Sequence, residues 1–259
     1  MIRRVTTAGL LIPLVIIAIR YLPFYLFLVL LDIIILLSLV ELFKLLAIHN
    51  VKGHRLTFVL AILLSWIWIL SPVWLINFLI LTTLICIGNS VLQFGKDKGG
   101  FISASANLLA IVYISVPVSI AGSLHKNGRW EELLLILSVI WAGDTVAYLV
   151  GRKWGQHKVI KKISPHKSLE GYLAGLLGSV LVAIVFGYYF LPTWSMLYLL
   201  LSGLVLAAAG MLGDLFESTI KRSANFKDSS NLLPGHGGVL DRLDSLFVAL
   251  PAYHFLLIW

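Results

Sequence analysis

The chain has 259 residues, of which 59% are hydrophobic and only 12% are charged. Its mean hydropathy of +0.97 excludes an ordinary water-soluble domain and predicts that lipid surrounds most of the surface. The formal net charge of +8 would be compatible with nucleic-acid binding, but the basic residues follow a membrane-topology pattern, so we expect no nucleic-acid partner.

Apolar segments long enough to cross a bilayer recur along the whole chain. Each can form a helix, which satisfies its own backbone hydrogen bonds in lipid. We therefore predict an all-α integral membrane protein with about nine transmembrane helices. The predicted spans, in chain order, are 5–20, 23–43, 56–71, 73–93, 102–123, 132–151, 171–190, 195–218 and 243–259.

The lysine and arginine residues predict how these spans are oriented. With the N-terminus in the cytoplasm, all of them except Arg20, Lys126 and Arg129 fall on the cytoplasmic side. This is the bias that the positive-inside rule describes, so we predict a cytoplasmic N-terminus and an external C-terminus. The two long polar connections, 152–170 and 219–242, then face the cytosol, and we expect the functional site there, at a bacterial-type inner or plasma membrane.

These features divide the chain into two predicted parts. Residues 1–130 form an N-terminal part of about five spans. Residues 131–259 form a C-terminal part that holds both long cytoplasmic loops and most of the acidic residues within spans. We expect the chemistry to be in this second part.

Two predicted spans carry polar stripes at helical spacing. A central Asp in a spanning helix costs about 2.5–3.5 kcal/mol, so such residues should face protein or a wet cavity. The stripe of the sixth span contains Asp144, Tyr148, Gly151 and Arg152, and that of the eighth contains Gly210, Gly213, Asp214, Glu217, Ser218 and Lys221. Both stripes run from a cytoplasmic loop into the membrane, as the walls of a polar cavity would.

The densest polar segment runs from Ser218 to Asp244. Basic groups and glycine amides suit phosphates, while closely spaced carboxylates suit divalent cations. We therefore predict that this segment is the centre of the site. Its candidate residues are Lys221, Arg222, Lys227, Asp228, His236, Gly237, Gly238, Asp241, Arg242 and Asp244.

Asp241 and Asp244 are three residues apart at the start of the last span. In a helix their side chains project from one face, with Cβ atoms roughly 5–6 Å apart. They could share one Mg²⁺ or bridge two ions. The alternative is that these carboxylates only pair with nearby basic side chains. For His236, a phosphate contact or a structural role in the turn is favoured over metal ligation, because Mg²⁺ prefers oxygen ligands.

The basic loop between the sixth and seventh spans allows two interpretations. Attraction to anionic headgroups accounts for Lys158, Lys161 and Lys162. Three further residues, Lys167, Ser168 and Glu170, lie against the seventh span and are better candidates for the site. Two acids of the second span, Asp32 and Glu41, have no obvious partner, and we expect structural pairing or helix contacts for both.

Three motifs carry a resemblance to a known family. The segment 218–244 reads S-x-I-K-R-x4-K-D-x-S-x2-L-P-x-H-G-G-V-x-D-R-L-D and resembles the signature of the phosphatidate cytidylyltransferases, or CDP-diacylglycerol synthases. The blocks D-T-V-A-Y-x2-G-R at 144–152 and S-P-H-K-S-x-E-G at 164–171 are also similar to that family. The last block departs at His166 and Ser168, where the family pattern has Lys and Thr. The first hundred residues resemble the family only as hydrophobic spans.

The resemblance implies a reaction of phospholipid biosynthesis, in which CTP and phosphatidate give CDP-diacylglycerol and pyrophosphate. It implies Mg²⁺ with a second cation, for which K⁺ is a candidate. Separately, we expect membrane lipids and a second copy of the chain, in a homo-oligomer, as partners. Metal ligands would be Asp214, Asp241, Asp244 and Asp144. The other catalytic residues would be Lys221, Arg222, Lys227, Asp228, His236 and Arg242. Substrate-binding residues would be Asp144, Tyr148, Arg152, Lys167, Ser168, Glu170, Glu217, Ser218, Gly237 and Gly238.

Two alternatives remain open at this point. A CTP-dependent lipid-alcohol kinase would also join a nucleotide to a membrane substrate, but it would release CDP rather than pyrophosphate. A transporter is compatible with acids inside spans, although its substrate site would lie near the midplane. A P-loop enzyme is excluded because no G-x4-G-K-[ST] motif occurs.

Overall fold

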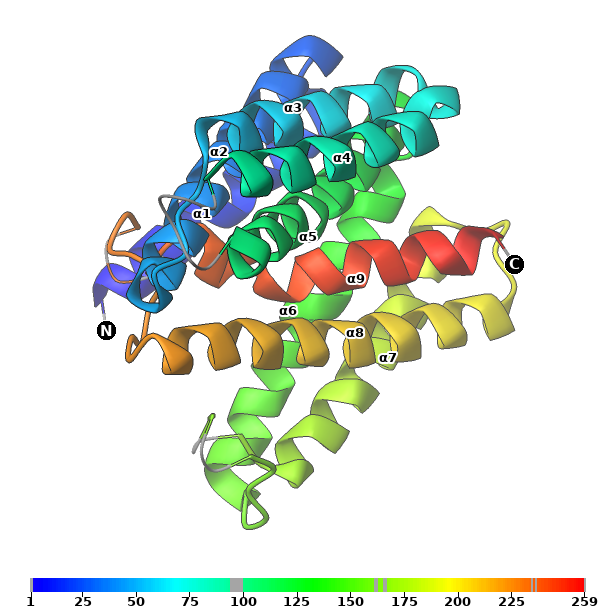
Figure 1. Cartoon of the computed structure of the whole chain (residues 1–259). Helices are drawn as coiled ribbons and strands as arrows, with labels where there is room; N and C mark the ends of the chain where they lie inside the picture. The colour runs from blue at the N-terminus through cyan, green and yellow to red at the C-terminus, as the bar shows by residue number, and fades with distance from the viewer. Residues whose placement is uncertain are drawn as a thin grey trace. The chain divides into compact units, whose positions relative to one another are not determined.

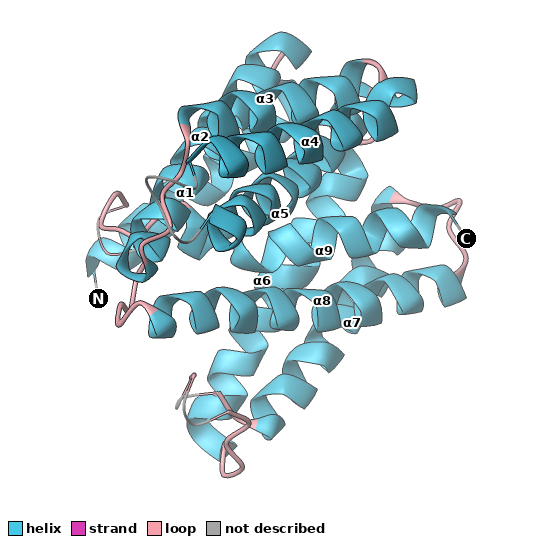
Figure 2. Ribbon diagram, in the orientation of Figure 1, coloured by secondary structure: helices cyan, strands magenta, loops and turns pink. Residues whose placement is uncertain are grey.

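The structure, a computed structural model, is mostly helical (Figure 1, Figure 2). It describes residues 2–93, 100–160, 163–164, 167–233, 235 and 237–258, and within these ranges it contains isolated β-bridges but no strand. The α-helices are α1 (Ile2–Tyr21), α2 (Phe24–Leu46), α3 (Arg55–Leu70), α4 (Leu75–Gln93), α5 (Gly100–Lys126), α6 (Trp130–Trp154), α7 (Leu169–Phe190), α8 (Met196–Ser223) and α9 (Leu240–Ile258). Two short 3-10 helices are η1 (Ala47–His49) and η2 (Pro72–Trp74).

A helix lies at each of the predicted spans, so the all-α fold is confirmed for the described part of the chain. Within that part, six segments are long and apolar enough to cross a membrane, which indicates a multi-pass membrane protein. They are Phe24–His49, Pro72–Leu92, Gly100–Lys126, Trp130–Trp154, Leu169–Phe190 and Met196–Ser223. The count of nine spans and the orientation of the termini stay predictions.

The chain folds into two compact units. The first contains Met1–Asn127 together with Ser223–Arg242, and the second contains Gly128–Arg222 together with Leu243–Trp259. The polar loop between α8 and α9 therefore packs with the N-terminal helices, although it lies far from them in sequence.

In the first unit, α5 packs against α2, α3 and α4 (Figure 1). Its core is formed by fully buried aliphatic side chains, among them Ile35, Leu39, Leu64, Ile111 and Ile114. Polar contacts also hold the layers together. The amide oxygen of Asn107 on α5 accepts from the Thr57 hydroxyl at 2.5 Å and from the His54 backbone N–H at 3.2 Å. Asn107 thus ties α5 to the first turn of α3.

In the second unit, α6 and α7 make the most extensive helix contact, through small residues. A Cβ atom added at Gly175 of α7 would lie 2.8 Å from the Gly143 carbonyl oxygen and 2.9 Å from the Ala147 Cβ. The Ser179 hydroxyl donates to the Val139 carbonyl oxygen at 2.9 Å. Small side chains let the two helix backbones approach, as is usual for helix pairs in membranes.

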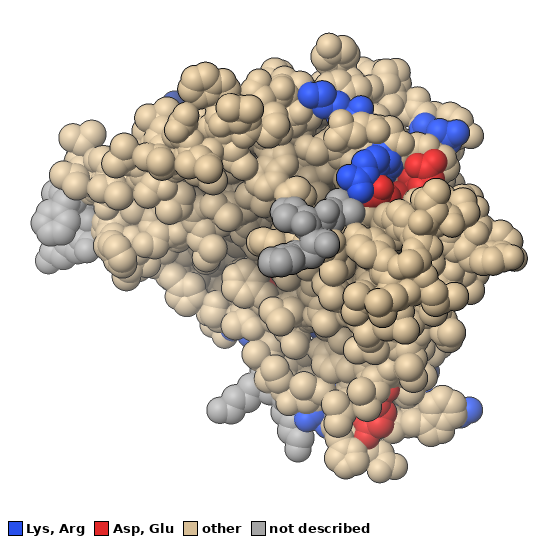
Figure 3. All heavy atoms as spheres, turned by 90° about the vertical axis from the view of Figure 1, so that its right-hand side faces the viewer, with Lys and Arg blue, Asp and Glu red and all other residues tan. Residues whose placement is uncertain are grey.

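The outward face of α7 is apolar. Leu173, Leu177, Leu181 and Val185 follow each other at four-residue spacing, and each is 57–64% exposed. Uncharged residues also make up most of the face shown in Figure 3. A stripe of this kind in water would be unfavourable, so it is a surface for lipid.

Candidate active site

A polar pocket of about 640 Å³ lies in the second unit. Helices α6, α7 and α8 and the loop between α6 and α7 contribute its walls. The lining residues include Asp144, Tyr148, Arg152, Lys158, Lys167, Ser168, Tyr172, Met211 and Asp214. The two predicted polar stripes, on α6 and α8, thus meet at one pocket through Asp144 and Asp214.

The Lys167 ammonium forms an ion pair with the Asp214 carboxylate inside this pocket. Both side chains are partly buried. The other oxygen of Asp214, Oδ1, lies 3.4 Å from the Ser218 hydroxyl, one turn further along α8. Opposite charges so close to each other in a partly buried site can be separated only if new partners replace them. An anion for Lys167 and a cation for Asp214 would meet that condition.

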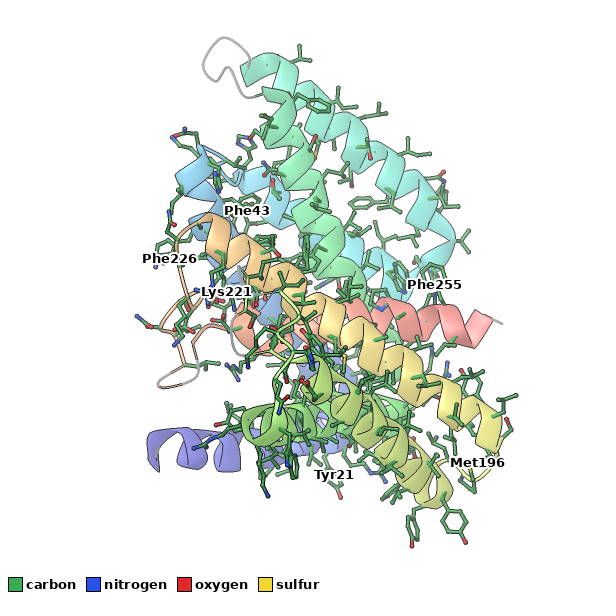
Figure 4. The ribbon with its side chains drawn as sticks, turned by 90° about the horizontal axis from the view of Figure 1, so that it is seen from below. Tyr21, Phe43, Met196, Lys221, Phe226 and Phe255 are labelled. Carbon is green, nitrogen blue, oxygen red and sulfur yellow. The ribbon has the colours of Figure 1, made fainter. Side chains whose placement is uncertain are left out.

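A second charged group continues along α8 beside the start of α9. Lys221 donates to Oε2 of Glu217 at 2.6 Å, and the Glu217 side chain is completely buried. Glu217, Asp214 and Lys221 all act electrostatically on the carboxyl group of Asp244 in α9. Figure 4 shows Lys221 near one end of α8 and Met196 at the other. The charged residues of α8 are all in its C-terminal half.

The loop between α6 and α7 is closed by two residues that the sequence placed at the site. Ser168 is the N-cap of α7, where its hydroxyl accepts from the Gly171 backbone N–H at 3.2 Å. Glu170 accepts from the His157 backbone N–H at 3.1 Å and lies 2.6 Å from Nδ1 of the same histidine. Ser168 lines the pocket, whereas Glu170 fixes the loop beside it. Arg152 and Tyr148 contact each other at 3.4 Å on the opposite wall.

The turn before α9 belongs to the first unit and is organised around Asp241. Oδ2 of Asp241 accepts from the backbone N–H groups of Ser229 and Gly238, both at 2.8 Å, and lies 2.8 Å from the Ser229 hydroxyl. Gly235 and Gly237 have φ values of 78° and 77°, a region in which residues with a Cβ are strained. The run of glycines therefore meets a backbone requirement of the turn.

Glu41 of α2 is the partner of this turn that sequence reasoning missed. Its carboxylate accepts from the hydroxyls of Ser229 and Ser230 at 2.9 and 2.6 Å, and from the backbone N–H groups of Val239 and Leu240 at 3.1 and 2.8 Å. The only sequence signal was an acid in a helix made almost entirely of apolar residues. Such a group must find hydrogen-bond donors from elsewhere in the chain.

The remaining predicted residues lie at different places. Nε of Arg222 donates to the Ile163 carbonyl oxygen at 3.2 Å, which joins the end of α8 to the loop between α6 and α7. Lys227, Asp228 and Arg242 are exposed in the first unit. His236, predicted to be catalytic, lies outside the described residues.

The acidic side chains fit Mg²⁺ by chemistry, because they supply the oxygen ligands that this ion prefers. In the second unit, Asp214 and Glu217 both act on Asp244, so three carboxylates are in electrostatic contact. Among the described residues, however, no three Asp, Glu, His or Cys side chains have the arrangement of a metal site. Two of the three carboxylates are instead paired with lysines, Asp214 with Lys167 and Glu217 with Lys221.

These observations define an all-helical, multi-pass membrane protein with a charged pocket among its helices. A model of a family described as the cytidylyltransferase family matches residues 2–259. The chain belongs to this family.

The most similar relatives include proteins named phosphatidate cytidylyltransferase from three staphylococci. The Staphylococcus haemolyticus protein is 38% identical over 163 residues, which cover 63% of this chain and 62% of the relative. The Staphylococcus saprophyticus protein is 36% identical over 186 residues and 71% of each chain. The Staphylococcus aureus (strain COL) protein is 36% identical over 181 residues and 69% of each chain. The first of these matches thus spans slightly less than two thirds of the relative.

Proposed function

We propose that this protein is a phosphatidate cytidylyltransferase, which makes CDP-diacylglycerol and pyrophosphate from CTP and phosphatidate. The observation that carries the proposal is the pocket that joins Asp144, Lys167 and Asp214 in a chain of this family. It offers cationic and anionic side chains to a polyanionic nucleotide, within helices apolar enough to lie in the bilayer where the second substrate resides.

The reaction would be an in-line displacement at the α-phosphorus of CTP. A phosphate oxygen of phosphatidate forms a bond to this phosphorus, and the bond between the α-phosphorus and the oxygen that bridges it to the β-phosphorus breaks. Pyrophosphate leaves with that bridging oxygen. A phosphate monoester has a second pKa of about 6, so the nucleophile is already ionised near neutral pH and the site needs no strong general base.

Lys167 and Lys221 are proposed to bind phosphate oxygens. Each is paired with a carboxylate in the structure, with Asp214 and Glu217 respectively. When the triphosphate enters, each ammonium gains an anionic partner that can replace or supplement the carboxylate. Arg222, which borders the same loop through Ile163, is proposed to assist in neutralising the leaving group. Arg152 and Tyr148 would contact substrate from the α6 wall.

Asp144, Asp214 and Asp244 are proposed to hold Mg²⁺, with K⁺ as the candidate for a second cation. When bound, Mg²⁺ would neutralise phosphate charge and make the α-phosphorus more electrophilic. For Asp241, in the first unit, the role of metal ligand stays a prediction from the motif, as do the phosphate-binding roles of Lys227, His236 and Arg242. The cytosolic orientation of the site and a homo-oligomeric state are part of the same proposal.

Label transfer tests the reaction directly. Purified protein in detergent would be incubated with phosphatidate, Mg²⁺ and CTP labelled with ³²P at either the α- or the γ-position. We expect α-label in the lipid, γ-label in pyrophosphate, and neither product with EDTA. Entry of γ-label into the lipid would establish a kinase instead. Absence of any transfer by folded protein that binds CTP would contradict both reactions and favour a binding or transport role.

A further inference from the structure

Glu41 occupies an unusual position for a carboxylate. It lies near the C-terminal end of α2, in a helix made almost entirely of apolar residues, and is only 4% exposed. A buried carboxylate is costly unless hydrogen bonds compensate for the lost water. All four compensating donors come from the segment 229–240, nearly 200 positions later in the chain. The hydroxyls of Ser229 and Ser230 are 188 and 189 positions after Glu41, and the backbone N–H groups of Val239 and Leu240 are 198 and 199 positions after it.

The donors divide evenly between the two carboxylate oxygens. Oε1 accepts from the Ser230 hydroxyl and the Val239 N–H, and Oε2 accepts from the Ser229 hydroxyl and the Leu240 N–H. The two backbone groups are at the N-terminus of α9, where N–H groups have no partner within the helix. The negative charge of Glu41 is also favourable at that end of the helix dipole. Glu41 therefore both caps α9 and holds the loop before it.

Ser229 connects Glu41 to Asp241. Its hydroxyl lies 2.9 Å from Oε2 of Glu41 and 2.8 Å from Oδ2 of Asp241, while its backbone N–H donates to the same Asp241 oxygen. Gly238 adds a further N–H to Asp241. A displacement of Ser229 from Glu41 would thus move the groups that orient the Asp241 carboxylate.

We propose that Glu41 is a positioning residue for the turn 229–241, and that it sets the orientation of Asp241 and of the Gly238 backbone. The inference rests on the proposed function, because it assigns Glu41 to the turn that carries part of the cytidylyltransferase motif. Glu41 acts through this turn and contacts neither substrate. Glu41 thus adds a residue of α2, a helix outside the three motifs, to those on which the reaction depends.

The contacts require an acceptor-only side chain of this length. A glutamine at position 41 has one acceptor oxygen, so its NH₂ group would face either the Val239 N–H or the Leu240 N–H, whichever way the amide is turned. The serine hydroxyls can rotate to accept, but a backbone N–H cannot. Glu41→Gln therefore leaves one donor opposed to another donor, although it changes the volume of the side chain little.

The test compares Glu41→Gln with Glu132→Gln. Glu132 is also buried, but it is held by Arg129 and Tyr253 in the second unit and lines no part of the pocket. It controls for the general effect of losing a buried carboxylate. Both variants would be purified in detergent, and circular dichroism would show that they keep their helices. The measurements are amide hydrogen exchange at 238–240 and steady-state kinetics with CTP over a series of Mg²⁺ concentrations.

We expect Glu41→Gln to accelerate amide exchange at 238–240 and to lower kcat/KM by about 10- to 100-fold, the range found for residues that orient metal ligands from outside. The Mg²⁺ concentration that gives half-maximal activity should rise. Glu132→Gln should leave both the exchange at 238–240 and the Mg²⁺ requirement at wild-type values. A Glu41→Asp variant keeps the charge and should recover part of the activity.

Either of two results would overturn the proposal: unchanged exchange at 238–240, or accelerated exchange with a wild-type kcat/KM and Mg²⁺ requirement. If Glu41→Gln fails to fold, Ser230→Ala removes a single donor to Glu41 and should show smaller changes of the same kind. Absence of cytidylyl transfer by the wild-type protein would defeat the proposed function and with it the positioning role. The exchange measurement would still establish whether Glu41 holds the turn.

Discussion

Lys167 is the side chain whose environment should change most when a nucleotide binds. It is paired with Asp214 and lines the pocket, so an incoming phosphate would compete directly for its ammonium group. A lysine held in this way can bind an anion without first being ordered, since its side chain is already fixed.

Lys167→Met should lower kcat/KM for CTP by about 10²- to 10³-fold, the usual effect of removing one charge-stabilising donor. The matched control is Lys153→Met. Lys153 lies at the end of α6, where its ammonium is 4.5 Å from the Trp154 ring centroid, and it lines no part of the pocket. Steady-state kinetics on both variants would test the assignment. Comparable losses in the two would mean that only the overall positive charge matters.

Asp214→Asn should lower turnover by more than the loss of a residue that only positions a metal ligand would. Loss of a residue that only orients a metal ligand costs about 10- to 100-fold, so the loss of a proposed ligand should exceed the upper figure. Asp32→Asn is the control, because Asp32 lies on α2, where it accepts from the Trp66 indole N–H at 3.1 Å. Turnover at saturating Mg²⁺ is the measurement. Near-wild-type turnover by folded Asp214→Asn would exclude Asp214 as a ligand.

At the residue scale, sequence separation decided which contacts could be predicted. Glu217 and Lys221 are four positions apart, and their ion pair follows from helical spacing. The partner of Lys167 is 47 positions away, and those of Glu41 are at least 188 positions away. Periodicity contains no information about such pairs. The polar stripe of the eighth span selected Asp214 as a site residue, and the loop position and the motif resemblance selected Lys167, but only the structure joins the two.

At the scale of elements, the contact between α6 and α7 determines the shape of the pocket. Two pocket-lining glycines, Gly143 and Gly171, are in this contact, and a side chain at either would meet the opposite helix. Close helix packing and an open pocket therefore depend on the same small residues.

Gly175→Val should destabilise the protein by about 1–3 kcal/mol, as is usual for overpacking. The added side chain would meet the Gly143 carbonyl and the Ala147 Cβ at distances shorter than van der Waals contact. Gly88→Ala on α4 is the control, since no atom lies within 4 Å of an added Cβ there. Alanine at that position should instead stabilise the helix by up to about 1 kcal/mol. Thermal unfolding in detergent would separate the two effects.

The positions of the helices could be predicted because apolar runs must bury their backbone polar groups in helices. The predicted ends of the helices were less accurate than their positions. Helix α8 continues to Ser223, past the predicted end at 218, because its last turns are polar but still helical. Hydropathy detects where a segment leaves an apolar environment, whereas the helix itself ends where its hydrogen bonding ends.

At the scale of the whole molecule, the distribution of basic residues predicts on which side of the membrane each loop lies. The sole cysteine is Cys86, and it is buried. In a Cys86→Ser background, Gln156→Cys and Thr193→Cys introduce exposed thiols into the loops before and after α7. A membrane-impermeant maleimide added to intact cells should label only Thr193→Cys. Labelling of Gln156→Cys alone would invert the predicted topology.

The division into units could not have been predicted from composition. Hydropathy and the motifs suggest a boundary near 130, but nothing in the apolar pattern assigns the segment 223–242 to the N-terminal helices. The contacts between this segment and the N-terminal helices include the four hydrogen bonds to Glu41, which form only after the chain has folded.

The late arrival of this segment affects biosynthesis. Ribosomes add about 5–20 residues per second, so Ser229, which is 188 positions after Glu41, is made roughly 10 to 40 s later. During that interval the nascent N-terminal helices must accommodate an acid whose permanent donors do not yet exist. The first unit therefore cannot mature in the order in which it is translated, and truncated chains that end before the turn would expose an incompletely assembled helix bundle to quality-control proteases.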